Sequence, residues 1–203
     1  MKIGISHDSF MVKAPGRDPK RKPILFYGTS ITQGGCASRP GMCHTAIIGQ
    51  WMDYPVLNFG FSGNGRMEPE MARLYAELDP SVYILDCLPN MNGDLVRERV
   101  VPFVNILREK HPGTPILLVE DRSYANSYIS QPRRKANEAN RAALKESYEQ
   151  LKRNGVGKLF YLSGDTLLGE DREDTVDGSH PTDLGFMRQA EAFRDALIPI
   201  LGK

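Results

Sequence analysis

The sequence predicts an α/β fold with a five-stranded parallel sheet that helices cover on both faces. After Pro23, short apolar segments alternate with longer segments of helical periodicity, which is typical of parallel sheets. The apolar segments have no polar alternation, which indicates strands buried on both faces. The expected strands are 24–27, 56–59, 82–85, 116–119 and 159–162, and the expected helices are 43–53, 68–78, 94–111, 133–153 and 183–200.

The composition fits one domain of ordinary globular type. The chain has 203 residues, which is enough for a sizeable core. A formal net charge of +1 gives no electrostatic argument for nucleic acid or an anionic membrane as a partner. No apolar run approaches the ~18 residues of a membrane span, so no membrane-spanning helix is predicted.

Residues 1–22 differ from the segment that follows them. "MKIGISHDSF" alternates as an edge strand does, and the next residues combine Pro and Gly with five basic side chains. Such a basic segment is typical of a solvated linker. We therefore expect a strand and a linker in residues 1–22, as the remnant of a preceding domain, and a second domain over 23–203.

The cysteines and histidines predict neither a metal site nor a cofactor. Cys36, Cys43 and Cys87 form no C-x-x-C pair, and no histidine or cysteine pair has the spacing of metal ligands. Cys87 ends an apolar segment and is expected to be a small buried hydrophobe. We expect Cys36 and Cys43 to be free thiols, with pairing in an oxidising compartment as the alternative.

The first strand ends in "GTSITQGG", residues 28–35. Functional sites of open α/β sheets lie beyond the carboxyl ends of the strands, so this segment has two interpretations. It could hold a phosphate on its hydroxyls and backbone N–H groups, or Ser30 could be a nucleophile. It is not a Walker loop, and Thr32 stands where the α/β-hydrolase elbow needs glycine.

The second and third strands end in residues that could stabilise an oxyanion. Gly63, in "NFGFSGNGR", either permits a tight turn or presents a bare backbone N–H to a developing oxyanion. Asn90 follows Pro89 and is expected in a fixed turn, as a turn residue or as a side-chain amide donor.

Asp177 and His180 form a candidate acid–base pair. Two small residues separate them, immediately before the last predicted helix. In such a turn the carboxylate accepts from one imidazole nitrogen while the other nitrogen faces outward. His44 has no carboxylate two or three residues away, so it does not displace His180 as the candidate base.

Taken together, these segments favour acyl transfer over phosphate binding. A phosphate loop explains Ser30 and its neighbours but leaves Asn90 and the Asp177–His180 pair without a role. Acyl transfer uses Ser30 as nucleophile, His180 as base and Asp177 as the group that orients the base. A flavodoxin-like phosphate- or nucleotide-binding domain stays the alternative from another class.

The set Gly28-Thr29-Ser30, Gly63, Asn90 and Asp177-x-x-His180 resembles the SGNH (GDSL-type) hydrolase family over residues 24–200. The resemblance implies a flavodoxin-like three-layer α/β/α fold. Two blocks depart from the family's pattern. Gly-Asp-Ser-Leu is Gly-Thr-Ser-Ile here, and Gly-x-Asn-Asp is Leu-Pro-Asn-Met. Because Ser30 and Asn90 are kept, we expect the family's chemistry in a pocket of different shape around Asn90.

The resemblance implies a metal-free serine esterase. The triad would be Ser30, His180 and Asp177, and the oxyanion hole would combine the backbone N–H groups of Ser30 and Gly63 with the Asn90 amide. The segments "FYGTSITQG", "SRPGM" and "GFSGNGR" are similar to bacterial members that carry a β-rich domain ahead of the hydrolase. Such members are often exported, which would place the protein in the periplasm or outside the cell.

The expected substrate is a short acyl ester, acetyl above all, of a small or oligosaccharide alcohol. The loops expected around the site are rich in Gly, Ser, Asn, Arg, Asp and Tyr, and they lack the cluster of large apolar residues that an acyl chain needs. Arg66, Arg122 and Tyr124 are candidate substrate contacts. The alternatives within the fold are a lipase or lysophospholipase and a thioesterase.

Overall fold

The computed structural model describes residues 3–13, 16, 18 and 20–202. In this part of the chain, five parallel strands form one sheet in the order β2-β1-β3-β4-β5. The predicted α/β class is confirmed, and each predicted strand lies within one residue of its observed bounds. The strands are β1 Ile24–Gly28, β2 Val56–Gly60, β3 Val82–Asp86, β4 Ile116–Val119 and β5 Leu159–Leu162.

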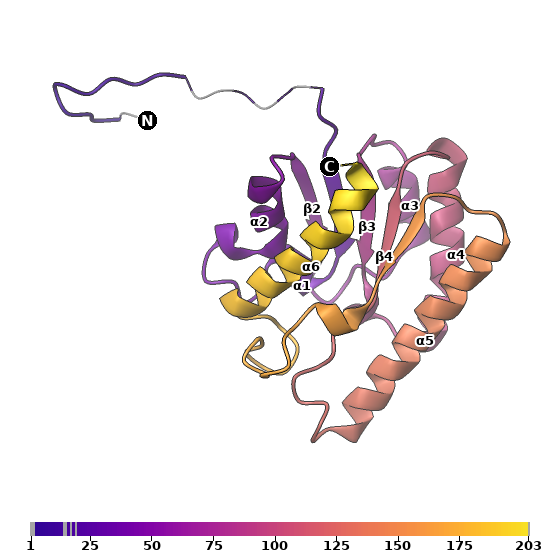
Figure 1. The fold of residues 1–203 in the computed structure, drawn as a ribbon. Coiled ribbons are helices and arrows are strands. Elements are labelled where there is room, and N and C mark those ends of the chain that lie inside the picture. The colour runs from indigo at the N-terminus through magenta and orange to yellow at the C-terminus, as the bar shows by residue number, and fades with distance from the viewer. Residues whose placement is uncertain (1–2, 14–15, 17, 19, 203) are drawn as a thin grey trace.

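Two layers of helices cover the sheet (Figure 1). Residues alternate across each strand, so Leu25 and Tyr27 pack on one face of β1 while Ile24 and Phe26 pack on the other. The first face carries α3 Pro69–Tyr75, α4 Gly93–Lys110 and α5 Gln131–Arg153, and the second carries α2 His44–Trp51 and α6 Asp183–Leu201. This is the expected three-layer α/β/α arrangement.

Four short helices were not expected from the sequence. They are α1 Ser30–Gln33 and the 3-10 turns η1 Pro40–Met42, η2 Leu88–Asn90 and η3 Gly164–Thr166. Helix α1 begins two residues after β1 ends, with Thr29 Oγ1 accepting from the Ile31 N–H at 3.2 Å. It ends at Gly34, whose φ of 100° lies in the left-handed region that glycine favours. This short helix presents Ser30 at the carboxyl edge of the sheet.

The predicted N-terminal strand does not form over residues 3–10, and residues 1 and 2 of that prediction lie outside the described residues. The described residues 3–13 contain no strand, and Figure 1 shows them running apart from the sheet. Phe10 is 84% exposed, so the alternating apolar side chains of this segment have no partner surface to cover. A single strand needs another strand to satisfy its backbone, and none lies beside it here. The origin of residues 1–22 in a preceding domain stays a prediction.

Candidate active site

Ser30 and His180 lie side by side although 150 residues separate them in the sequence. Ser30 is the first residue of α1, and its Oγ lies 2.9 Å from Nε2 of His180. His180 immediately precedes Pro181 and the start of α6, at the same edge of the sheet. The two side chains predicted as nucleophile and base are therefore within hydrogen-bond distance.

A tight turn joins Asp177 to His180. Asp177 Oδ2 lies 2.7 Å from His180 Nδ1, and Oδ1 accepts from the backbone N–H groups of His180 and Ser179 at 2.8 and 2.9 Å. The Val176 N–H donates to the His180 carbonyl at 2.9 Å and closes the turn. Because three donors converge on one carboxylate, the orientation of the imidazole ring is fixed.

The charge of Asp177 determines which nitrogen of His180 carries the proton. Partial burial raises the pKa of Asp177, but the hydrogen bonds from His180 and Ser179 outweigh it and bring the pKa to about 2. An ionised carboxylate can only accept, so Nδ1 of the neutral ring donates to Asp177. Nε2 is then the acceptor for the Ser30 hydroxyl, which is the arrangement that a general base requires.

A neighbouring loop braces this turn. The Ala125 N–H donates to the Gly178 carbonyl at 3.0 Å, and the Asn126 side chain packs so closely on Gly178 that a Cβ there would lie 2.5 Å from Nδ2. Gly178 has a φ of 90°, a conformation that glycine adopts without strain. Glycine at this position thus permits both the turn and the close approach of the bracing loop.

Asn90 and the loop that carries Gly63 lie together at the ends of β3 and β2. The Asn90 side chain donates from Nδ2 to the carbonyl of Asn64, and at 3.4 Å to that of Phe61. Gly63 has a φ of 68°, and its Cα faces open space. Asn90 therefore lies in a turn but holds the glycine loop rather than its own backbone, with its longer contact directed to Phe61.

The three predicted substrate contacts differ in accessibility. Arg66 is exposed and donates from Nη2 to the Gly63 carbonyl at 2.9 Å. Tyr124 is half-buried, with the Arg133 guanidinium 5.8 Å from its ring centroid, and it lines a hollow of about 340 Å³ near the Asp177–His180 turn. Arg122 was wrongly predicted, because its side chain is fully buried in an ion pair with Asp86 and has no surface to offer a substrate.

His44 is excluded as a rival base by its surroundings. Its ring is fully buried and stacks against Phe186 and Phe193, with centroid distances of 5.7 and 5.3 Å. Burial, and then the Arg122 cation, lowers the pKa of His44 to about 3. The ring is thus a neutral part of the core between α2 and α6.

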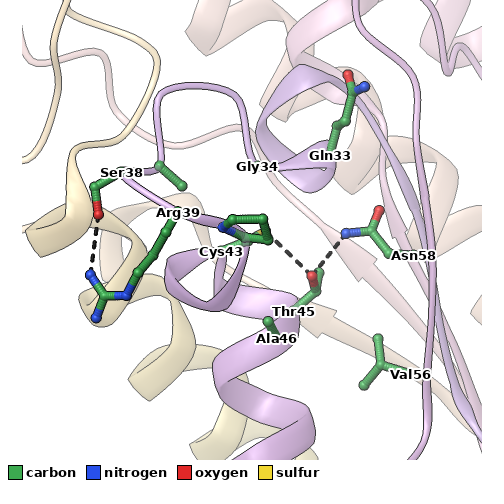
Figure 2. A pocket seen from close by; sticks show the side chains of 11 residues that line it. Gln33, Gly34, Ser38, Arg39, Cys43, Thr45, Ala46, Val56 and Asn58 are labelled. Atoms are coloured by element: carbon green, nitrogen blue, oxygen red, sulfur yellow. Dashed lines mark hydrogen bonds between the residues drawn. The ribbon is translucent and has the colours of Figure 1, made fainter. Parts of the chain in front are cut away.

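A cavity lies beside helix α1 rather than over Ser30. It measures about 510 Å³ between α1, the start of α2 and β2, and Figure 2 shows Asn58 reaching across it to Thr45. A smaller hollow of about 340 Å³ adjoins the glycine loop and has a mainly apolar lining that includes Phe61 and Met71. Neither cavity has Ser30 or His180 in its wall.

Sequence reasoning missed a group of buried polar residues beneath Ser30. Thr32, Asp86 and Asp121 are all fully buried, as is Arg122. Asp86 was detectable in principle, because it is a carboxylate at the end of a strand that is otherwise apolar. Its partner was not, because Arg122 follows β4 in a segment that reads as a surface loop.

The described residues contain neither a candidate metal centre nor a membrane-spanning helix. No group of three His, Cys, Asp or Glu side chains that could hold a metal occurs among them. None of the helices in the described part of the chain is long and apolar enough to cross a membrane. Cys36, Cys43 and Cys87 are free thiols, and Cys87 is buried as expected.

Comparison with known proteins agrees with the fold and identifies the family. Residues 21–198 match the model of the GDSL-like lipase/acylhydrolase family. A GDSL-like lipase from Bacteroides ovatus is 40% identical, with a TM-score of 0.88 over 92% of this chain and 56% of its own. The chain thus spans little more than half the length of that relative. A search of curated proteins found no match.

Two more distant structures share the fold. A salicylyl-acyltransferase from a tetracycline biosynthetic pathway is 23% identical, with a TM-score of 0.77 over 90% of this chain and 56% of its own. A family two carbohydrate esterase from Clostridium thermocellum, solved with cellohexaose, is 17% identical, with a TM-score of 0.69 over 94% of this chain and 67% of its own. Because the family model covers most of the sequence, the chain belongs to the GDSL-like lipase/acylhydrolase family, a family of carboxylic ester hydrolases.

Proposed function

We propose that this protein is a serine esterase that removes short acyl groups, acetyl above all, from a carbohydrate alcohol. The observation that carries the proposal is the continuous chain from Ser30 Oγ to His180 Nε2 at 2.9 Å and from His180 Nδ1 to Asp177 at 2.7 Å. These distances are those of a nucleophile, its general base and the carboxylate that orients the base.

The reaction proceeds through an acyl-enzyme. His180 Nε2 takes the Ser30 proton as Oγ bonds to the ester carbonyl carbon, and the carbonyl π electrons move to oxygen. The tetrahedral intermediate then expels the alcohol, which receives the proton from His180. Water repeats the sequence on the acyl-Ser30 ester and releases the carboxylic acid. Asp177 stays ionised and stabilises the imidazolium in both halves of the reaction.

The oxyanion of the tetrahedral intermediate would be held by three donors. These are the backbone N–H groups of Ser30 and Gly63 and the side-chain amide of Asn90. One Asn90 amide hydrogen holds the Asn64 carbonyl, whereas the contact with Phe61 at 3.4 Å is long and weak. The hydrogen in the weaker contact is the one available to an oxyanion.

The polar alcohol part of the substrate is supported by the side chains around the triad. Arg66 is exposed beside Gly63, and Tyr124 borders a hollow whose wall includes Ala125, the residue that bonds to Gly178. A guanidinium suits sugar hydroxyls, and an aromatic ring can stack on a sugar face. The fold is shared with a carbohydrate esterase, which is consistent with a carbohydrate alcohol as part of the substrate.

A second candidate is a hydrolase of longer acyl chains. The hollow beside the glycine loop favours it, because its lining is mainly apolar, includes Phe61 and Met71, and adjoins the proposed oxyanion donors. Each methylene buried on such a wall is worth ~0.8 kcal/mol, or about fourfold in kcat/KM. Affinity for an acyl tail should therefore rise steeply with its length if this hollow is used.

One substrate series separates the two candidates. Purified protein is assayed with p-nitrophenyl esters from acetate to decanoate and with acetylated sugars, with the Ser30→Ala variant as the control for background hydrolysis. We expect the highest kcat/KM with acetyl esters and release of acetate from acetylated sugars. A kcat/KM that climbs beyond butyrate contradicts the short-acyl proposal. If a fluorophosphonate does not label Ser30, the proposal that the protein is a serine esterase is wrong.

A further inference from the structure

Helix α1, which carries Ser30, needs support from outside itself. It has only four residues, far fewer than a helix requires to be stable in isolation. Its third residue, Thr32, is fully buried and is held from both neighbouring strands. Asn58 of β2 donates to the Thr32 carbonyl at 2.7 Å, and the Thr32 hydroxyl donates to Asp86 of β3 at 3.2 Å.

The Asp86 carboxylate that receives Thr32 is itself held by a buried cation. Arg122 Nη2 lies 3.0 and 3.2 Å from the two Asp86 oxygens, and neither side chain has any exposed surface. The arginine is fixed in turn through its backbone, because Asn137 donates to its carbonyl at 3.0 Å. A chain of contacts thus runs from the start of α5 through Arg122 and Asp86 to the nucleophile helix.

Gly28 leaves the space in which the Thr32 hydroxyl contacts Asp86. A Cβ at Gly28 would lie 2.1 Å from the Thr32 hydroxyl and 2.7 Å from the Asp86 carbonyl. Any side chain at this position would displace either the hydroxyl or β3. The hydroxyl of Thr32 therefore lies against the strand immediately before the Ser30 turn.

A buried ion pair is a poor choice if stability alone is required. Removing two charges from water costs several kcal/mol for each ion, and apolar residues of similar volume are often as stabilising or more so. Arg122 Nη1 also lies 3.7 Å from the buried Asp121 carboxylate, but neither Nε nor Nη1 of the arginine makes a hydrogen bond among the described residues. The free-energy cost of burying these charges is explained if they fix the orientation of helix α1.

We infer that Thr32, Asp86 and Arg122 form a positioning unit that aims Ser30 Oγ at His180. The inference rests on the proposed esterase function, and none of the three residues touches substrate. Thr32 lies two residues after the nucleophile, so a tilt of α1 changes the 2.9 Å distance between Ser30 Oγ and His180 Nε2 directly. A displacement of ~1 Å at such a site can cost ~10²-fold in rate.

The test compares Thr32→Val, which removes only the hydroxyl, with Thr32→Ser, which keeps it. Ser147→Ala is the matched control, because Ser147 is a buried hydroxyl that donates within α5 at 2.9 Å, far from Ser30 in the fold. For each variant we measure kcat, KM, the rate of fluorophosphonate labelling at Ser30 and the thermal melting temperature.

We expect Thr32→Val to lower kcat and the labelling rate by ~10–100-fold with little change in KM. Its melting temperature should stay close to that of Ser147→Ala, and the pH profile of kcat/KM should keep its shape because His180 is still the base. Thr32→Ser should retain activity within about threefold of the wild type.

Three results would overturn the inference. One is wild-type labelling and kcat in Thr32→Val. The second is a loss in Thr32→Ser as large as that in Thr32→Val, which would mean that keeping the hydroxyl does not preserve the position of Ser30. The third is a wild-type protein that is not labelled at Ser30, which overturns the proposed function together with the positioning unit. Only the first two leave the esterase proposal intact.

Discussion

Two acid–base pairs at the same edge of the sheet have opposite designs. Asp177 and His180 lie three residues apart in one turn, and their side chains are 52% and 33% exposed. Asp86 and Arg122 come from the ends of two neighbouring strands and are fully buried. The first pair is in contact with water, whereas the second is enclosed in the core, where burial raises the pKa of Asp86 and the Arg122 cation opposes that rise. The comparison suggests a division between a pair that reacts and a pair that positions.

The most severe loss of activity is expected from the exposed pair. Ser30→Ala or His180→Ala removes one member of a proton-transfer unit and should lower kcat/KM by on the order of 10⁴–10⁶. Neither side chain is packed inside the core. The urea concentration at the midpoint of unfolding should therefore stay near that of the wild type. Activity is followed with an acetyl ester, and folding by circular dichroism. Wild-type turnover by either folded variant would end the assignment of the triad.

The most severe loss of stability is expected from the buried pair. Arg122→Met leaves the buried carboxylates of Asp86 and Asp121 without their cation, which should lower the free energy of unfolding by about 3–5 kcal/mol. Arg66→Met, at an exposed arginine, is the control and should change it by less than ~0.5 kcal/mol. Urea titrations of both variants measure the difference. Equal stability of the two variants would mean that the buried pair does not behave as charged.

Asn90→Ala should fall between these extremes in activity. Removal of one oxyanion donor costs ~10²–10³ in kcat, while the nucleophile and base stay in place. We therefore expect slow turnover together with continued fluorophosphonate labelling of Ser30. The test measures kcat and the rate of fluorophosphonate labelling in the same preparation of the variant. Loss of an oxyanion donor usually has a far larger effect than threefold. If kcat falls by less than about threefold, Asn90 only holds the glycine loop.

His44 and His180 show the same contrast between a buried and a partly exposed group. The change in stability expected from His44 is smaller than that expected from Arg122. The pKa of His44 is about 3 in the folded protein, whereas an unfolded histidine has a pKa of ~6.5. Below pH ~6.5 the unfolded chain therefore binds a proton that the folded protein excludes. The stabilisation is full above this pH and decreases as the pH falls toward 3, by ~2 kcal/mol at pH 5.

The measurement is the free energy of unfolding at pH 7 and pH 5 for the wild type and for His44→Phe. The phenylalanine keeps the aromatic contacts with Phe186 and Phe193 but cannot bind a proton. We expect the variant to lose ~2 kcal/mol less than the wild type between the two pH values. Parallel losses in both proteins would show that His44 is protonated in the folded state.

The sequence predicted the features that depend on local patterns. The five strands follow from apolar segments of four or five residues, and the Asp177–His180 turn follows from two residues of the right chemistry at short spacing. Arg122 could not be placed in the same way. An arginine after a strand reads as a surface residue until the sheet order β1-β3-β4 is known, because that order brings Asp86 beside it. The edge strand expected in residues 1–10 does not form over the described residues 3–10 for a related reason, because a strand needs a neighbouring strand to pair with.

The distance along the chain between Ser30 and His180 also has a consequence for biosynthesis. The nucleophile is among the first residues of the domain to be made, and its base follows 150 residues later. At a synthesis rate of ~5–20 residues per second, roughly 8–30 s separate the two. The last helix must then leave the ribosome and dock before Ser30 can be deprotonated. On the proposed mechanism, a nascent chain is therefore unable to attack esters until its C-terminal helix has joined the sheet.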